Sequence, residues 1–132
     1  MGNVGYLLDT HVFLWAVRGS QKLSTTAERI IEDTSVQVYV SAISAYEIMS
    51  KHSKGKLSEF EDIAENYFNV FQSFGAEELS IKMHHMHFAG KFEWSHRDPF
   101  DRFIAAQAFI ENLTLITSDS AFHSLPWITV IW

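Results

Sequence analysis

Five acidic side chains have the residue types and positions that best suit chemistry: Asp9, Glu47, Asp98, Asp101 and Asp119. Each of them follows an apolar segment expected to be a strand, or lies in the first turns of an expected helix. Two carboxylates about 4 Å apart repel each other by roughly 4 kcal/mol at an effective dielectric constant near 20. A cluster of them is therefore stable only if some carboxyls are protonated or a divalent cation is bound.

Hard cations such as Mg²⁺ and Mn²⁺ suit a site built from oxygen ligands without histidine or cysteine. The chain has no cysteine, so thiolate metal sites and disulfides are excluded. A carboxylate-bound cation suits hydrolysis of phosphodiesters, because it lowers the pKa of a bound water and stabilises charge on the phosphate. Each acid also has a structural interpretation: Asp9, Asp98 and Asp119 suit helix caps, and Glu47 precedes Lys51 by four residues, which favours a helical ion pair.

Short apolar segments alternate with helical patterns along the chain. Strands are expected at residues 4–8, 36–40, 113–116 and 128–131, with a shorter one near 78–81. Helices are expected at residues 11–17, 24–33, 41–54, 58–74, 82–91 and 98–112, with a helical turn at 120–123. Because the strands are apolar on both faces, the pattern indicates an α/β fold with a parallel sheet covered on both sides. Ligands of such sheets bind beyond the carboxyl ends of the strands, where Asp9 and Asp119 are expected.

The composition indicates one globular domain spanning residues 1–132, with 47% hydrophobic residues. A net charge of −6 counts against a simple nucleic-acid binder with a basic surface, unless the acids lie where cations neutralise them. No apolar segment is long enough to span a bilayer, and the N-terminus lacks the pattern of a secretory signal. We therefore expect a cytoplasmic protein with no membrane partner.

Four segments resemble, in order, the four motifs of PIN-domain ribonucleases. They are residues 7–11 (LLDTH), 40–48 (VSAISAYEI), 96–108 (HRDPFDRFIAAQA) and 115–119 (LITSD). The third segment has the form seen in VapC-type toxins of toxin–antitoxin pairs. The resemblance implies a PIN-like three-layer α/β sandwich, with a short, mainly parallel central sheet flanked by helices. It also implies Mg²⁺- or Mn²⁺-dependent cleavage of RNA, homodimers, and inhibition by a cognate antitoxin.

The resemblance also assigns roles to residues at the matching positions. The residues that it makes both metal-binding and catalytic are Asp9, Glu47, Asp101 and Asp119. Asp98 is an auxiliary acid, since Asp101 is the one that precedes the Ile-Ala-Ala segment. Thr117, two residues before Asp119, is expected to support the site by hydrogen bonding. All the acid positions of the motifs are filled, which favours an active enzyme.

Basic residues near the acids are candidates for RNA contacts. Lys51 and Lys54 follow Glu47 and could bind phosphates, a contribution that does not depend on base sequence. The same lysines also suit a solvated helix end. Arg102 lies beside Asp101, so it could meet phosphate or pair with a site carboxylate.

The histidines do not indicate a second metal site. The spacing of His84, His85 and His87 does not place three ligands on one helical face, and no nearby carboxylate completes a zinc site. We expect surface or half-buried roles for these three. His96 is nearer the acids, and we expect it to position the turn at Asp98.

Two other functions use the same residues. A metal-dependent phosphatase acting on small phosphoesters could employ the same acids. An enzyme that forms a phosphoaspartate needs a second aspartate two residues after Asp9. That position is His11, which counts against this alternative. The other alternative is a non-catalytic dimeric binding module, which missing acids would have favoured.

Overall fold

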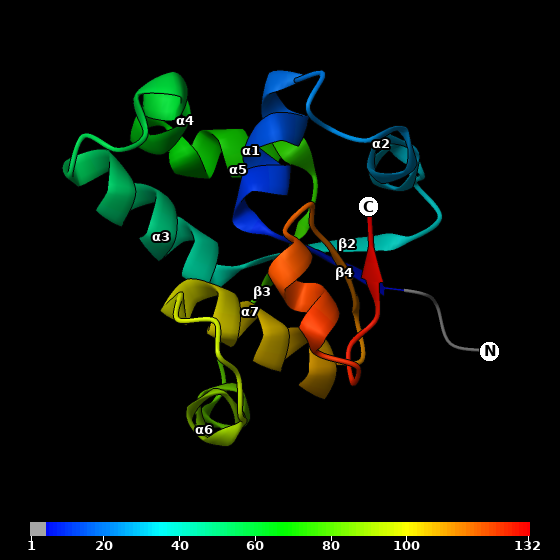
Figure 1. Ribbon diagram of the computed structural model, residues 1–132. Coiled ribbons are helices and arrows are strands. Elements are labelled where there is room, and N and C mark those ends of the chain that lie inside the picture. The colour runs from blue at the N-terminus through cyan, green and yellow to red at the C-terminus, as the bar shows by residue number, and fades with distance from the viewer. Residues whose placement is uncertain (1–4) are drawn as a thin grey trace.

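The central feature of the computed structural model, which describes residues 5–132, is a five-stranded sheet (Figure 1). Its strands are β1 (Gly5–Leu8), β2 (Gln37–Ser41), β3 (Glu77–Leu79), β4 (Thr114–Ile116) and β5 (Val130–Ile131). Neighbouring strands pair in parallel, in the order β3-β2-β1-β4-β5. The predicted α/β fold with a parallel sheet is therefore confirmed. Val4, expected to begin the first strand, lies outside the described residues.

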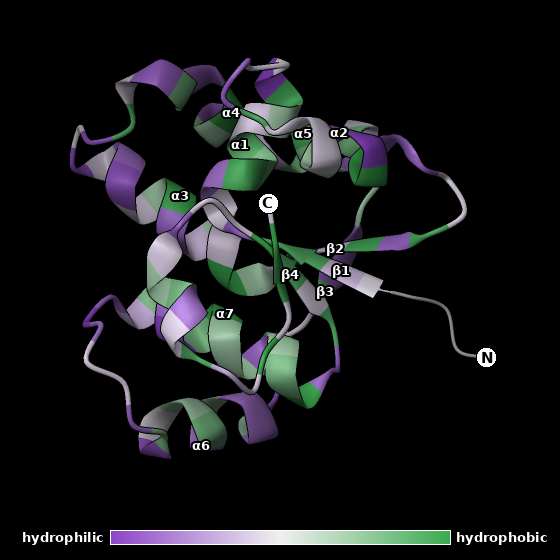
Figure 2. Ribbon diagram, turned by 45° about the vertical axis from the view of Figure 1, so that its right-hand side comes forward, coloured by the Kyte–Doolittle hydropathy of each residue, from purple (hydrophilic) through white to green (hydrophobic). Residues whose placement is uncertain are grey.

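Helices cover both faces of the sheet. They are α1 (Thr10–Arg18), α2 (Thr25–Glu32), α3 (Ala42–Ser53), α4 (Glu61–Glu65), α5 (Tyr67–Phe74), α6 (Met83–Lys91) and α7 (Pro99–Ile110). Figure 2 shows α1, α2, α4 and α5 on one side of the sheet and α6 and α7 on the other. Residues 5–132 contain no helix with both the length and the apolar character needed to cross a bilayer.

Successive strand residues face opposite helix layers. In β1, Leu8 packs in the cluster that contains residues of α1, α2, α4 and α5, whereas Leu7 packs with residues of α7. In β4, Ile116 packs in the same cluster as Leu8, and Leu115 packs in the same cluster as Leu7. All four side chains are fully buried. Burial on both faces explains why these segments are continuously apolar instead of alternating with polar residues.

The prediction of a single helix over residues 58–74 is wrong. The segment forms a 3₁₀ turn at Ser58–Phe60, then α4 and α5, with a break at Asn66. Asn66 has φ −118° and ψ 32°, and its side-chain amide donates a hydrogen bond to the carbonyl of Asp62. Asparagine side chains compete in this way with the backbone bonds of a helix. The amphipathic pattern continues through the break because Ile63 of α4 and Phe71 of α5 pack in the same core.

Two short strands differ in extent from the prediction. β3 begins one residue earlier than residue 78 and ends at Leu79, which pairs with Ser41. Beyond it, the carbonyl of Ser80 accepts a hydrogen bond from the side chain of Gln107. β5 contains only Val130 and Ile131 of the expected residues 128–131.

Candidate metal centre

The carboxyl ends of the parallel strands bring the predicted acids together. β1 ends at Leu8 and β4 ends at Ile116, so Asp9 and Asp119 leave the same edge of the sheet. A pocket of about 440 Å³ at this edge is lined by Asp9, His11, Trp15, Glu47, Lys51, Asp98, Asp101, Ser118 and Asp119. The structure thus places the four predicted metal-binding acids and the auxiliary acid around one pocket.

Asp9 is held by hydrogen bonds to both of its carboxylate oxygens. As the N-cap of α1, its Oδ1 accepts from the backbone N–H of Thr10 at 2.8 Å. Its Oδ2 accepts from the hydroxyl of Thr117 at 2.7 Å, and the Thr117 oxygen accepts from the N–H of Asp119 at 3.0 Å. Burial raises the pKa of Asp9 and nearby Glu47 adds to this, although the two hydrogen bonds oppose the shift. Thr117 therefore makes the hydrogen bonds expected of it and joins two of the acids.

Glu47 is buried, with 4% of its surface exposed, and both of its oxygens are hydrogen-bonded. Oε1 accepts from the Thr10 hydroxyl at 2.7 Å, and Oε2 accepts from the Lys51 ammonium at 2.6 Å. Because the Thr10 proton goes to Glu47, the hydroxyl of Ser44 must donate to Thr10 at 2.8 Å. Thr10 and Ser44 lie within the first two motifs, but no site role was predicted for either of them. The available signal was their position, directly after Asp9 and three residues before Glu47.

Asp98 and Asp101 have different surroundings in the first turn of α7. Asp98 is the N-cap, and its Oδ1 accepts from the N–H groups of Phe100 at 2.9 Å and Asp101 at 3.4 Å. Asp101 is 8% exposed, and its Oδ2 lies 2.7 Å from Nε2 of His96. His96 therefore contacts Asp101, in the turn that Asp98 caps.

Burial raises the pKa of Asp101 to about 7, and the neighbouring carboxylates Asp9, Asp98 and Asp119 contribute, against the lowering effect of the His96 hydrogen bond. The same hydrogen bond raises the pKa of His96, so near neutral pH the two side chains share a proton in the absence of a cation. Among residues 5–132, ligand atoms of His96, Asp98 and Asp101 all lie within 4.8 Å of one another.

The donor set fits a hard divalent cation. The pocket is lined by carboxylates that follow β1 and β4 and by carboxylates on α3 and at the start of α7. One basic side chain, Lys51, pairs with Glu47; burial opposes its protonation, but the Glu47 carboxylate raises the pKa of Lys51 overall. The Lys51 ammonium does not offset the burial of the other acids, because the pKa values of Asp9 and Asp101 are still raised. A divalent cation would relieve the remaining repulsion.

The sequence pattern of the PIN domain matches residues 6–128. This chain belongs to the PIN-domain family. The match covers each of the acids that line the pocket. No curated protein sequence is significantly similar to this PIN domain.

Solved structures with the same fold come from toxin–antitoxin complexes. A chain of VapBC2 from Rickettsia felis, bound to a promoter DNA fragment, is 19% identical with a TM-score of 0.67, and the similarity covers 97% of this chain and 98% of that one. A chain of DNA-bound VapBC from Salmonella typhimurium is 18% identical with a TM-score of 0.66, covering 97% of each chain. A chain of a toxin–antitoxin complex from Klebsiella pneumoniae is 18% identical with a TM-score of 0.62, covering 96% of each. At these identities the similarity establishes the fold.

The three basic residues predicted to meet RNA differ in their placement in the PIN domain. Lys51 lines the pocket, and Lys54 is exposed at the C-cap of α3. Arg102 directs two guanidinium nitrogens to the carbonyl of Phe92, each at 2.9 Å, and lies over the Phe92 ring. Arg102 thus contacts Phe92 and, among the described residues, pairs with no site carboxylate, which was one of the two roles expected of it.

The histidines of α6 in this PIN domain do not gather into a metal site. His84 and His87 are exposed, as expected. The prediction of a surface or half-buried role for His85 is wrong, because its side chain is fully buried. Its Nδ1 accepts from the N–H of Lys82 at 3.0 Å, and its Nε2 lies 2.7 Å from Glu111. This partner is 26 residues away and becomes a neighbour only when α6 packs on α7.

Proposed function

We propose that this PIN domain is an endoribonuclease that hydrolyses RNA phosphodiester bonds with Mg²⁺ or Mn²⁺. The observation that carries the proposal is the convergence of Asp9, Glu47, Asp101 and Asp119 on one pocket. Membership of the PIN-domain family supports it. We further propose that the chain is the toxin of a VapBC-type toxin–antitoxin pair.

In the proposed mechanism the cation would be held by Asp9, Glu47, Asp101 and Asp119. When bound, the cation supplies an activated water and stabilises the negative charge on the attacked phosphate. The Thr10 and Thr117 hydroxyls fix one oxygen each of Glu47 and Asp9, so these carboxylates are oriented before any ligand arrives. Asp98 caps α7 and thereby holds the backbone of Asp101.

Of the basic residues predicted to bind phosphate, Lys51 lies beside the acids, because it lines their pocket and its ammonium pairs with Glu47. We propose that it contacts an RNA phosphate, with Lys54 following near the end of the same helix. Such contacts strengthen RNA binding without reading its sequence. They also offer an acidic chain of net charge −6 a local attraction for a polyanion.

The test of the proposed function is cleavage of RNA by the purified protein. Total RNA, transfer RNA and ribosomal RNA are incubated with Mg²⁺ or Mn²⁺, with and without a chelator, using the wild type and Asp9→Asn. Discrete fragments that disappear with the chelator and with the substitution support a carboxylate–metal ribonuclease. Equal cleavage by both proteins identifies a contaminant. Mn²⁺ binding without cleavage of any RNA contradicts the proposal and favours a phosphatase of small phosphoesters.

Replacing Thr117 with valine is expected to lower the cleavage rate by about 10- to 100-fold, the usual cost of losing a partner that orients a metal ligand. Valine has a similar shape but leaves Oδ2 of Asp9 and the N–H of Asp119 without the hydroxyl. The control is Thr117→Ser, which keeps the hydroxyl and should stay within a few-fold of the wild type. The rates are compared at a temperature where both variants give the wild-type circular dichroism spectrum. Equal rates for valine and serine would contradict the proposed role.

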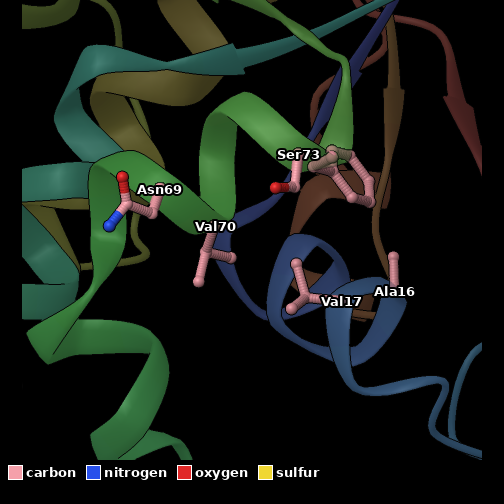
Figure 3. Close-up of a pocket in the computed structure, with 6 residues that line it drawn as sticks. Ala16, Val17, Asn69, Val70 and Ser73 are labelled. Carbon is pink, nitrogen blue, oxygen red and sulfur yellow. The ribbon is translucent and has the colours of Figure 1, made fainter.

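We propose that a cognate antitoxin and a second copy of the chain bind apolar helix surfaces. One such surface is a groove of about 430 Å³, where Ala16 and Val17 of α1 face Asn69, Val70 and Ser73 of α5 (Figure 3). The toxin–antitoxin complexes with the same fold support an antitoxin partner. Light scattering of the purified chain tests the dimer, since the mass should be twice 15.2 kDa.

Another apolar surface suits the second copy. Tyr46 and Met49 of α3 and Phe68 of α5 are 64%, 45% and 83% exposed. Side chains of α3 and α5 also line a shared hollow between these helices. A light-scattering mass equal to that of one chain would contradict the proposed dimer.

A further inference from the structure

A group of fully buried polar side chains lies outside the acid pocket and joins three elements. Gln107 of α7 accepts a hydrogen bond through Oε1 from the hydroxyl of Ser41, at the end of β2. Its amide nitrogen donates to the carbonyl of Ser80 at 3.2 Å and lies 3.3 Å from Nδ1 of His85 on α6. Gln107 and His85 are 0% exposed and Ser41 is 1% exposed. Buried polar groups of this kind are stable only when their hydrogen bonds are satisfied.

The directions of the hydrogen bonds in this group follow from one backbone donor, the N–H of Lys82, and one backbone acceptor, the carbonyl of Ser80. The N–H of Lys82 can only donate, so Nδ1 of His85 carries no proton and accepts. Nε2 of His85 therefore carries the proton and donates to Glu111. The carbonyl of Ser80 can only accept, so Gln107 presents its NH₂ group to Ser80 and His85 and turns its carbonyl oxygen toward Ser41. Ser80 and His85 together thus set which side of the Gln107 amide meets Ser41.

The bond between Ser41 and Gln107 joins the two helices that carry buried acids of the pocket. Ser41 is the N-cap of α3, where its oxygen accepts from the N–H of Ile43 at 3.0 Å. Glu47 lies six residues after Ser41, and Asp101 lies six residues before Gln107. At 1.5 Å per residue, each acid is about 9 Å along its helix from the bond. Since α3 and α7 pack directly, this bond lies at one end of their contact and the acids at the other.

We propose that Gln107 is a positioning residue, which fixes α3 against α7 through Ser41 and thereby sets the separation of Glu47 and Asp101. This inference rests on the proposed nuclease function. An apolar side chain of the same length would fill the space, but it would leave α3 free to slide or turn against α7. A shift of one helix by about 1 Å moves its acid by the same amount, and displacements of that size can cost about 100-fold in rate.

The test compares Gln107→Met, which keeps the side-chain length without the hydrogen bonds, with Ser41→Ala and the conservative Ser41→Thr. Cation affinity is measured with Tb³⁺, a luminescent hard cation that Trp15 in the pocket can sensitise, and RNA cleavage is measured separately. We expect Gln107→Met and Ser41→Ala to weaken Tb³⁺ binding about tenfold and to slow cleavage by about 10- to 100-fold. Ser41→Thr keeps the hydroxyl, so its Tb³⁺ affinity and its cleavage rate should both stay near the wild-type values.

A stability control separates positioning from general destabilisation. Ile30→Ala removes a half-buried side chain from α2, which carries none of the acids. Each variant is assayed well below its own melting temperature. A purely structural role predicts that Gln107→Met, once folded, binds Tb³⁺ and cleaves RNA as Ile30→Ala does, and that result would overturn the inference.

The remaining outcomes distinguish this inference from the proposed function. If the wild type binds Tb³⁺ but cleaves no RNA, weaker binding by Gln107→Met still supports the positioning role while the nuclease function fails. If the wild type cleaves RNA and both variants match it in affinity and rate, the function stands and the inference fails. A wild type that neither binds the cation nor cleaves RNA overturns both.

Discussion

Asp101→Asn is expected to slow cation-dependent RNA cleavage by about 10³-fold, because loss of charge stabilisation worth about 4 kcal/mol corresponds to that factor. Asparagine keeps the shape of the side chain and can still accept from His96. It removes a negative charge that burial and three neighbouring carboxylates disfavour, as the pKa of about 7 shows. The variant should therefore unfold at an equal or higher temperature than the cation-free wild type at pH 8. Activity and stability should change in opposite directions.

The measurement is the single-turnover cleavage rate together with the melting temperature of the same preparation. Asp33→Asn is a matched control, since Asp33 is exposed, caps the end of α2 and is hydrogen-bonded to Ser35. This control should cleave RNA at the wild-type rate. An Asp101→Asn variant within tenfold of the wild-type rate would remove Asp101 from the proposed metal site.

The apparent affinity for Mn²⁺ is expected to fall about tenfold for each pH unit below 7, because the cation must displace the proton that Asp101 shares with His96. Titrations between pH 5.5 and 8 measure this slope. Asp101→Asn should bind Mn²⁺ more weakly at pH 8, and its Mn²⁺ affinity should depend less steeply on pH, by one displaced proton. An identical slope in the variant and the wild type would show that another group carries the displaced proton.

The same shift determines how stability depends on pH. The folded pKa of Asp101, about 7, lies above its ordinary value of 3.8, so the folded chain binds more protons than the unfolded chain between these values. The contribution of Asp101 to the free energy of unfolding is therefore fully present below the lower value. It is lost as the pH rises through about 7. Saturating Mn²⁺ should offset this loss at the alkaline end.

Local sequence patterns were sufficient to predict the sheet and the gathering of the acids at its edge, because both depend on neighbours along the chain. Leu7 and Leu8 are apolar because opposite faces of β1 are covered, and Asp9 follows where that strand ends. The parallel arrangement then brings Asp9 and Asp119 to one edge without any further information. Glu47 joins them because α3 leaves the sheet where β2 ends, and Asp101 joins them because α7 begins beside the pocket.

Contacts between layers could not be predicted from the sequence. His85 looked like one of several surface histidines because its partner Glu111 lies on another helix. The break at Asn66 was hidden by the apolar pattern, which continues through it. Thr10 becomes a partner of Glu47 only once α1 and α3 are packed.

The most direct test of the metal-site account is to titrate Mn²⁺ while following both its binding and the cleavage of a labelled RNA. The account predicts that the Mn²⁺ concentration giving half-maximal cleavage coincides with the one that half-saturates the acid pocket. Both should rise together in Asp119→Asn, whose side chain lines that pocket. Cleavage that proceeds without Mn²⁺ or Mg²⁺, or that keeps its midpoint while binding weakens, would show that the acids do not form the catalytic metal site.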